Sequence, residues 1–183
     1  MLTNEPQWVA IYTKARAEKK VDEKFGEMGM EHYLPLHKVL RRWSDRKKMV
    51  EVPLFSSYTF VRMCKMDKIR VRETPGVAFI VDFGGVEAIV SDKEIDAIKG
   101  LIDSEIEMHV AAIQQLKKGA KVRVLGGPLE GYEGVLVSNC KEGNFAVEIQ
   151  AISSCLLMSI ESDLLEVIEE KKKTTKTKTY TIR

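Results

Sequence analysis

The chain has 183 residues, of which 44% are hydrophobic and 31% are charged, and its formal net charge at pH 7 is +2. This length suits one domain of ordinary size or two small ones, and the apolar content is sufficient to build hydrophobic cores. The sequence has no apolar run of about 18 residues and no basic segment followed by an apolar one at its start, so it indicates neither a membrane span nor a secretory leader.

The positive charge is concentrated at the C-terminal end. Residues 169–183 hold six Lys or Arg and two Glu, which leaves 23 basic and 25 acidic residues in the rest of the chain. Because the body is not basic as a whole, any contact with nucleic acid must come from local patches.

The three cysteines are Cys64, Cys140 and Cys155, and none belongs to a C-x-x-C pair. An odd number of widely spaced cysteines argues against a disulfide framework or a zinc ribbon. We therefore expect a cytoplasmic protein without a metal or cofactor.

The first predicted element is a buried strand over Trp8–Thr13. A helix is predicted over Arg16–Gly29, where apolar residues recur at helical spacing and the final glycine provides a stop. The segment Met30–Leu40 is predicted to be extended. The segment Lys38–Lys48 contains six basic residues against Asp45 alone and lies between two extended runs, so we predict a projecting hairpin or loop.

A second strand is predicted over Tyr58–Val61, from its aromatic and β-branched residues. A short helix over Asp67–Glu73 and a strand over Val77–Val81 should follow. Ser91 and Glu94 then have the spacing of a capping box, which predicts the start of a third helix. This order indicates an α+β domain, residues 1–103, with helices packed against a mainly antiparallel sheet.

The remainder of the chain divides into three parts. Residues 104–116 show no clear strand and are predicted to be a linker, residues 117–168 to be an all-β unit, and residues 169–183 to be a disordered basic tail. Besides the hairpin described next, strands are predicted over Phe145–Ile149, Leu156–Ile160 and Leu164–Ile168.

The all-β unit opens with two short strands joined by a glycine-rich loop. Val122, Val124, Val135 and Val137 are spaced to share one face, with Arg123 and Leu136 on the other. The loop glycines, which permit a sharp bend, are Gly126, Gly127, Gly131 and Gly134. The segment resembles a KOW motif, which occurs in small SH3-like barrels. The alternative is an ordinary β-hairpin with a glycine-rich turn.

Four stretches together resemble the NusG family of bacterial transcription elongation factors, along nearly the whole chain to about Ile168. These stretches are Trp8–Lys14, Val52–Val61, Thr74–Val77 with Phe83-Gly84-Gly85, and the KOW-like segment. The resemblance implies an N-terminal NGN domain that docks by an apolar surface on the clamp helices of RNA polymerase and discourages pausing. It also implies a C-terminal SH3-like β-barrel.

The resemblance identifies candidate residues for the polymerase-binding surface or its support. They are Tyr12, Phe55, Tyr58, Phe60, Phe83, Ile95 and Ile98. Phe55 and Tyr58 are the preferred anchors because aromatic residues at a strand entrance are typical of interfaces. Core packing alone is the alternative for Phe60, Ile95 and Ile98.

Ser56-Ser57 stands where the general factor commonly has Pro-Gly, which favours a specialised paralogue resembling RfaH or the UpxY regulators of polysaccharide operons. Some such paralogues read exposed non-template DNA beside the polymerase. Candidate DNA contacts by this resemblance are Lys14, Arg16, Lys20, Lys24, Arg70 and Arg72. The RfaH-like His-Thr-Thr run is absent near Asp67, so contact with the polymerase gate loop is not implied. A general NusG-type factor is the alternative.

The basic segment offers a second candidate contact with nucleic acid. Arg41 and Arg42 can pair with phosphates, and Trp43 supplies a stacking surface for single-stranded bases. The alternative is solvated charge on a hairpin.

The KOW-like unit is expected to dock a second partner, by resemblance either the termination factor Rho or a ribosomal protein. Its period-two apolar pattern and glycines predict the β form rather than the helical hairpin known in RfaH-like proteins.

An enzyme is not expected. The three histidines, His32, His37 and His109, lack metal-ligand spacing, and no glycine-rich phosphate loop opens a helix. The main functional alternative is a KOW-containing module that binds ribosome or RNA without contacting polymerase.

Overall fold

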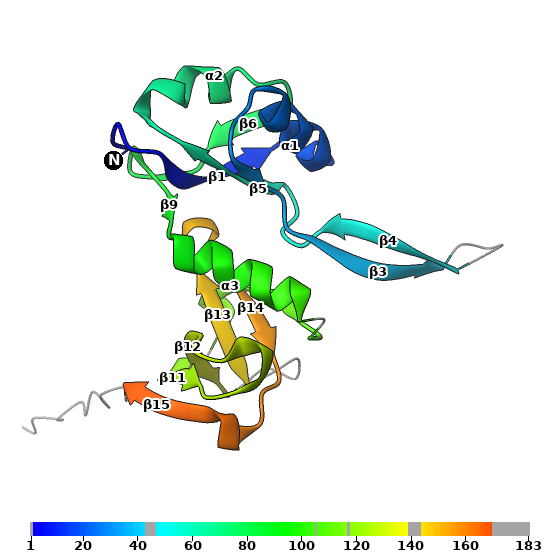
Figure 1. Cartoon of the computed structure of the whole chain (residues 1–183), viewed down its shortest axis with the longest axis vertical. Coiled ribbons are helices and arrows are strands. Elements are labelled where there is room, and N and C mark those ends of the chain that lie inside the picture. The colour runs from blue at the N-terminus through cyan, green and yellow to red at the C-terminus, as the bar shows by residue number, and fades with distance from the viewer. Residues whose placement is uncertain (1, 43–46, 105, 117, 139–143, 170–183) are drawn as a thin grey trace, which may run out of the picture.

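The computed structural model describes residues 2–42, 47–104, 106–116, 118–138 and 144–169. Helix α3 (Asp92–Asp103) lies between an N-terminal sheet with two further helices and a C-terminal sheet (Figure 1). The predicted mixture of helices and mainly antiparallel strands is confirmed. None of the helices in the described part of the chain is long and apolar enough to span a membrane.

The N-terminal sheet is antiparallel, in the order β2-β5-β1-β6, with β9 also paired to β1. Its strands are β1 (Gln7–Thr13), β2 (His32–Tyr33), β5 (Tyr58–Met63), β6 (Val77–Ile80) and β9 (Ile89–Val90). β1 lies at the centre because its apolar run can be buried on both faces. The predicted strands at residues 8, 58 and 77 are therefore confirmed.

The alternating side chains of β1 supply two separate cores. Val9 and Ile11 face α1 (Glu18–Glu27) and α2 (Lys68–Arg72), where they pack with Val21 and Phe25. The short 3-10 turn η1 (Lys65–Asp67) leads directly into α2. Both helices that the sequence predicts before residue 74 therefore cover the same face of the sheet (Figure 1).

Trp8 and Ala10 face the opposite side, where they belong to one buried cluster with α3 and the C-terminal sheet. The start of α3 is held by the predicted capping box, in which Ser91 Oγ accepts the backbone N–H of Glu94 and the Glu94 carboxylate accepts the backbone N–H of Ser91. Such a cap contributes about 1 kcal/mol.

Two hairpins stand outside this sheet. β3 (Leu36–Arg42) and β4 (Lys47–Pro53) form a two-stranded ribbon that projects from the body (Figure 1), as predicted for the basic segment. β7 (Asp82–Phe83) and β8 (Val86–Glu87) form a much shorter hairpin.

The C-terminal sheet has six antiparallel strands in the order β10-β14-β13-β12-β11-β15. They are β10 (His109–Ala112), β11 (Lys118–Val124), β12 (Glu133–Val137), β13 (Phe145–Ile149), β14 (Ser154–Met158) and β15 (Leu165–Glu169). The described residues of this half also form four short 3-10 turns: η2 (Ile113–Gln115), η3 (Gly127–Leu129), η4 (Gln150–Ile152) and η5 (Ser162–Leu164). The prediction of an all-β unit is confirmed for the described residues.

The expectation that residues 104–116 lack a strand is wrong. β10 pairs with β14 over four residues, from His109↔Leu157 to Ala112↔Ser154. The chain between the two units is thus an edge strand of the C-terminal sheet. Its sequence gave no strand signal because the partner strand is more than 40 residues away.

The predicted sharing of one face by four valines is also wrong. Val122 lies opposite Gly134, and Val135 lies opposite Lys121, so the valines of β11 and β12 occupy different faces. A Cβ atom at Gly134 would lie 2.5 Å from the ring of Phe145. The bulk of that ring therefore occupies the space beside Gly134 and fixes which face of β12 points to the core.

Candidate functional site

Three aromatic side chains from adjacent strands form a cluster on the sheet face that carries Trp8 and Ala10. Tyr12 on β1 stacks on Phe79 of β6, with ring centroids 4.8 Å apart and planes 13° apart. Tyr12 also meets Tyr58 of β5 edge-on at 5.1 Å. We call Tyr12, Tyr58 and Phe79 the aromatic surface. Because Phe79 is 51% exposed, the cluster offers apolar area to a partner rather than completing a core.

Partial burial removes water from the Tyr58 hydroxyl, and this raises its pKa above the ordinary value, with a smaller contribution from Tyr12. The ring therefore stays neutral and suits an apolar contact. The register of β1 places Tyr12 directly opposite both Tyr58 and Phe79, so the sheet itself builds the cluster.

The turn before β5 positions Tyr58. The backbone N–H of Thr13 donates to the carbonyl of Ser57 at 2.8 Å, and the N–H of Ser57 donates to the buried carboxylate of Glu18 at 2.7 Å. Ser57 adopts the left-handed conformation, with φ 64°. These bonds tie the turn to β1 and α1 and fix where β5 begins.

The other residues predicted for the apolar surface lie in two different environments. Phe55, Phe60, Ile95 and Ile98 are each at most 2% exposed and belong to the cluster shared by both sheets. Phe83 is 58% exposed on β7, opposite Val86. The structure thus brings Tyr12 and Tyr58 together and places four candidates in the core.

Phe79 was not among the residues predicted for the apolar surface. The run Val77-Ala78-Phe79-Ile80 lacks a simple alternation, and its burial pattern is buried, exposed, exposed, buried. The available signal was the neighbourhood of the Thr74–Val77 stretch, but the pairing with Tyr12 requires knowledge of the β1–β6 register.

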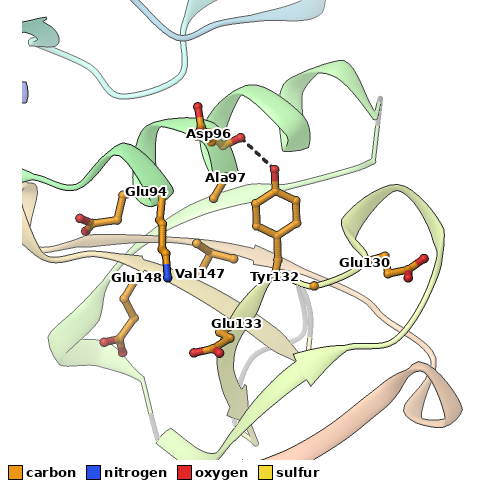
Figure 2. Close-up of a pocket in the computed structure, with 10 residues that line it drawn as sticks. Glu94, Asp96, Ala97, Glu130, Tyr132, Glu133, Val147 and Glu148 are labelled. Carbon is orange, nitrogen blue, oxygen red and sulfur yellow. Dashed lines mark hydrogen bonds between the residues drawn. The ribbon is translucent and has the colours of Figure 1, made fainter.

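The C-terminal sheet contacts α3 through Tyr132. The Tyr132 hydroxyl donates to the carbonyl of Asp96 at 3.0 Å (Figure 2). A Cβ atom at Gly100 would lie 2.6 Å from this hydroxyl, so the absence of a side chain at Gly100 makes room for the tyrosine. A cavity of about 420 Å³ lies beside this contact, between α3 and the C-terminal sheet.

The loop predicted from the KOW-like pattern closes on itself. Gly127 and Gly131 have φ values of 80° and 83°, which favour glycine, whereas Gly126 is extended. The N–H of Gly131 donates to the carbonyl of Val124, and the N–H of Val124 donates to the carbonyl of Tyr132. This loop therefore presents Tyr132 to α3, and the fourth glycine, Gly134, is required by the ring of Phe145.

The predicted nucleic-acid contacts between β1 and α1, and those on α1, differ in availability. Lys14, Arg16 and Lys20 are exposed and, within the described residues, make no ion pair. Lys24 pairs with Glu27.

On α2, the Arg70 guanidinium donates to the carbonyl of Met28, and Arg72 is exposed. The cations free to meet phosphate in this region are therefore Lys14, Arg16, Lys20 and Arg72.

The ribbon carries the remaining predicted contacts. The backbone of Arg41 and Arg42 pairs with Lys48 and Lys47 at the end of β3. Trp43 lies outside the described residues, so the predicted stacking surface is not described.

No group of three or more His, Cys, Asp or Glu residues in the described ranges is placed to hold a metal ion. The aromatic surface offers apolar contacts, and the exposed cationic positions offer electrostatic ones.

Comparisons with known proteins support one family. A family model described as "Transcription termination factor nusG" matches residues 6–99, which is just over half the chain. A search of curated proteins found no match.

Among solved structures, the chain is similar to one described as "Domain interaction in Thermotoga maritima NusG", with 24% identity and a TM-score of 0.50. The match covers 90% of this chain and 98% of that one, and it indicates a shared fold. Conformations A and B of an MjSpt4:Spt5 complex match at 14% and 15% identity. These two matches cover 90% and 91% of this chain and 99% of each matched chain, and both have a TM-score of 0.29.

Proposed function

The chain belongs to the NusG family, and on that premise we propose that it is a transcription elongation and antitermination factor that binds RNA polymerase through its aromatic surface. The observation that carries the proposal is the packed cluster in which the half-buried Tyr12 and Tyr58 adjoin the exposed Phe79. Large aromatic side chains that lose little conformational entropy are the usual anchors of protein interfaces.

The buried candidates have a supporting role in this proposal. Phe55 and Phe60 meet edge-on, with centroids 6.3 Å apart, beneath the start of β5. Ile95 and Ile98 lie on α3 in the same cluster. In the arrangement described here they hold the sheet that displays the aromatic surface, and a larger contact with polymerase would require the C-terminal sheet to move away from α3.

Nucleic acid beside the polymerase is the proposed second ligand of the N-terminal unit. Lys14 and Arg16 follow β1 directly, so they lie next to Tyr12 in the chain. A protein docked by the aromatic surface therefore carries free cations close to the docking site, where displaced non-template DNA would supply phosphates.

The C-terminal sheet is proposed to be an SH3-like barrel of the KOW type that docks Rho or a ribosomal protein. The support is its all-antiparallel order and the closed glycine loop before Tyr132. Leu125 and Val167 are each 52% exposed on or next to paired strands of this sheet, and each is a candidate apolar contact for a partner. The proposed N-terminal unit remains residues 1–103, and the proposed C-terminal unit, residues 117–168, also takes in the preceding strand β10.

A specialised paralogue rather than a general factor is the narrower proposal. Its support is the Ser56-Ser57 departure, since Ser57 holds a left-handed conformation at the position where the general factor commonly has glycine.

A transcription assay tests the proposed function. Purified core RNA polymerase elongates a template that carries a pause site and a terminator, with and without the full chain. We expect shorter pauses and more read-through with the chain, and loss of both effects with Tyr58→Ala/Phe79→Ala. Met66→Ala/Ile69→Ala is the matched control, because these side chains are 85% and 70% exposed on a different part of the surface. Absence of any effect by the unmodified chain would favour a ribosome- or RNA-binding module instead.

A further inference from the structure

We propose that the β3–β4 ribbon is an arm for double-stranded DNA, which lies in a groove of the duplex with its Leu40–Met49 pair facing the base edges. The inference rests on the proposed function, which brings DNA near the bound protein. It adds that this DNA is double-stranded and that the ribbon contacts it.

The ribbon has the dimensions of a groove-binding element. Seven residue pairs join its strands, from Leu36↔Pro53 at the base to Arg42↔Lys47 at the outer end. At about 3.3 Å per residue, this gives an arm roughly 20 Å long that extends away from both sheets (Figure 1). The major groove of B-DNA admits a two-stranded ribbon of this kind.

One face of the ribbon combines apolar and cationic side chains. Leu40 and Met49 lie directly opposite each other and are 57% and 53% exposed. Lys38 and Lys47 are on the same face, each two residues from a member of this pair. In a groove, the long apolar pair would contact the base edges at the floor, and the flanking ammonium groups would contact the phosphates along the walls.

The charge on the ribbon selects a polyanionic partner. Lys38, Lys47 and Lys48 are all exposed, and none makes an ion pair within the part of the chain that the structure describes. The one acidic residue of the two strands is Glu51, which lies opposite Lys38 on the side of the base. An apolar surface on a partner protein would not require this excess of unpaired cations.

The side chains favour a duplex over a single strand. Recognition of single strands depends on aromatic rings for base stacking. The two strands, residues 36–42 and 47–53, contain no Phe, Tyr or Trp, and Trp43 between them lies outside the described residues. Aliphatic side chains instead suit base edges and thymine methyl groups in a groove.

The base of the ribbon is held against the body. Lys19 of α1 donates from its Nζ to the carbonyl of Glu51 at 2.9 Å, which ties the ribbon to the body. The N–H of Leu54 donates to the carbonyl of Pro35 at 2.8 Å, which continues the pairing of the two strands at the base. Arg16 and Lys19 line a hollow together with Glu51 and Val52 at this base. Arg16, one of the free cations after β1, therefore lies close to the base of the cationic ribbon.

Binding of the full chain to two fluorescent DNAs tests the inference. The probes are a 20-base-pair duplex and one of its single strands, and anisotropy is measured over a series of salt concentrations. We expect tighter binding of the duplex. Lys38→Gln/Lys47→Gln should reduce the slope of log K against log salt by up to about 1.8, because each lost phosphate contact accounts for about 0.9.

A second variant tests the contribution of the Leu40–Met49 pair to duplex binding. Leu40→Ser/Met49→Ser should weaken duplex binding roughly tenfold without changing the salt slope, since it removes groove contacts and no charge. Met66→Ser/Ile69→Ser removes a comparably exposed apolar pair elsewhere and should bind as the unmodified chain does. Circular dichroism checks that all variants keep the fold, and the lysine variant tests the ribbon independently of any apolar substitution.

Tighter binding of the single strand, or duplex binding that neither ribbon variant changes, would overturn the inference. Binding to core polymerase is measured on the same samples. A chain that binds polymerase but prefers single strands contradicts only the ribbon inference, whereas one that binds duplex through the ribbon but not polymerase contradicts only the proposed function.

Discussion

Ser57 holds a backbone conformation that suits glycine better than serine. Its φ of 64° lies in the left-handed region, which costs a residue with a Cβ atom about 1–2 kcal/mol. The structure offsets this cost by letting the Ser57 N–H donate to Glu18. The turn at the start of β5 is therefore strained at one residue and secured by its neighbours.

Ser57→Gly should accordingly stabilise the protein. We expect the free energy of unfolding to rise by about 0.5–1 kcal/mol, because relief of the strain exceeds the entropy that glycine loses on folding. Ser57→Ala is the control, since it retains the Cβ atom and the backbone hydrogen bond. Urea unfolding of both variants provides the measurement, and equal stability of the two would show that strain at this residue is negligible.

Glu87 links stability to acid pH. Its side chain is buried and accepts from Lys68 and from the backbone N–H of Leu2, and these contacts, led by Lys68, lower its pKa from 4.5 to about 2. A lowered pKa in the folded state stabilises the protein fully above pH 4.5, and this contribution is lost as the pH falls to about 2.

Glu87→Gln should therefore be less stable than the unmodified chain at neutral pH, with a difference that narrows between pH 4.5 and 2. Chemical unfolding across this range measures the difference. Glu23→Gln controls for the loss of one exposed negative charge on α1. A Glu87→Gln difference that is constant with pH would mean that the carboxylate contacts do not contribute.

The pairing of strands β12 and β13 depends on the absence of a side chain at Gly134. Gly134→Ala would place a Cβ atom 2.5 Å from both the Phe145 ring and the backbone carbonyl of Ala146. Overpacking of this kind typically costs about 1–3 kcal/mol, and a backbone atom cannot move aside as a side chain can.

We therefore expect Gly134→Ala to lower the midpoint of thermal unfolding by several degrees. Gly126→Ala is the matched control from the same loop, because its backbone is extended and its nearest neighbour would be the Leu164 side chain at 3.6 Å. If both variants unfold at the same temperature, the close packing of Phe145 on Gly134 is not what sets this register.

The sequence predicted those elements whose signals are local. The capping residues of α3, the helical spacing of α1 and the apolar run of β1 all act within a few residues. β10 was missed because it is a strand only by pairing with β14. The faces of β12 were misassigned because Phe145, a residue of another strand, decides which side of Gly134 is filled.

The candidate site was predictable in part for the same reason. Tyr12 and Tyr58 lie in stretches that resemble the family, but the stacking of Phe79 on Tyr12 depends on the β1–β6 register. The burial of Ile95 and Ile98 depends on packing between two sheets that are far apart in the sequence. Local patterns contain no information about either contact.

For the whole molecule, the main structural relationship is the contact between α3 and the C-terminal sheet. Tyr132 reaches Asp96 through the space beside Gly100, and η4 contacts β1 and β9. Gly100→Ala should weaken this contact, because the added Cβ atom would lie 2.6 Å from the Tyr132 hydroxyl, while alanine strengthens the helix itself.

Small-angle X-ray scattering of the full chain measures this effect as a larger radius of gyration for Gly100→Ala. Tyr132→Phe is the control, since it removes the hydrogen bond but keeps the ring, and it should expand the molecule less. An unchanged radius for Gly100→Ala would show that the remaining buried cluster holds the sheets together without this contact.

The proposed binding of RNA polymerase by the aromatic surface is tested most directly by titrating the fluorescently labelled full chain with core polymerase. We predict saturable binding, weakened at least about 30-fold in Tyr58→Ala/Phe79→Ala, as expected when interface anchors each contribute on the order of 1–2 kcal/mol. Met66→Ala/Ile69→Ala should bind as tightly as the unmodified chain. Equal affinities for all three proteins, or no binding by the unmodified chain, would contradict the account.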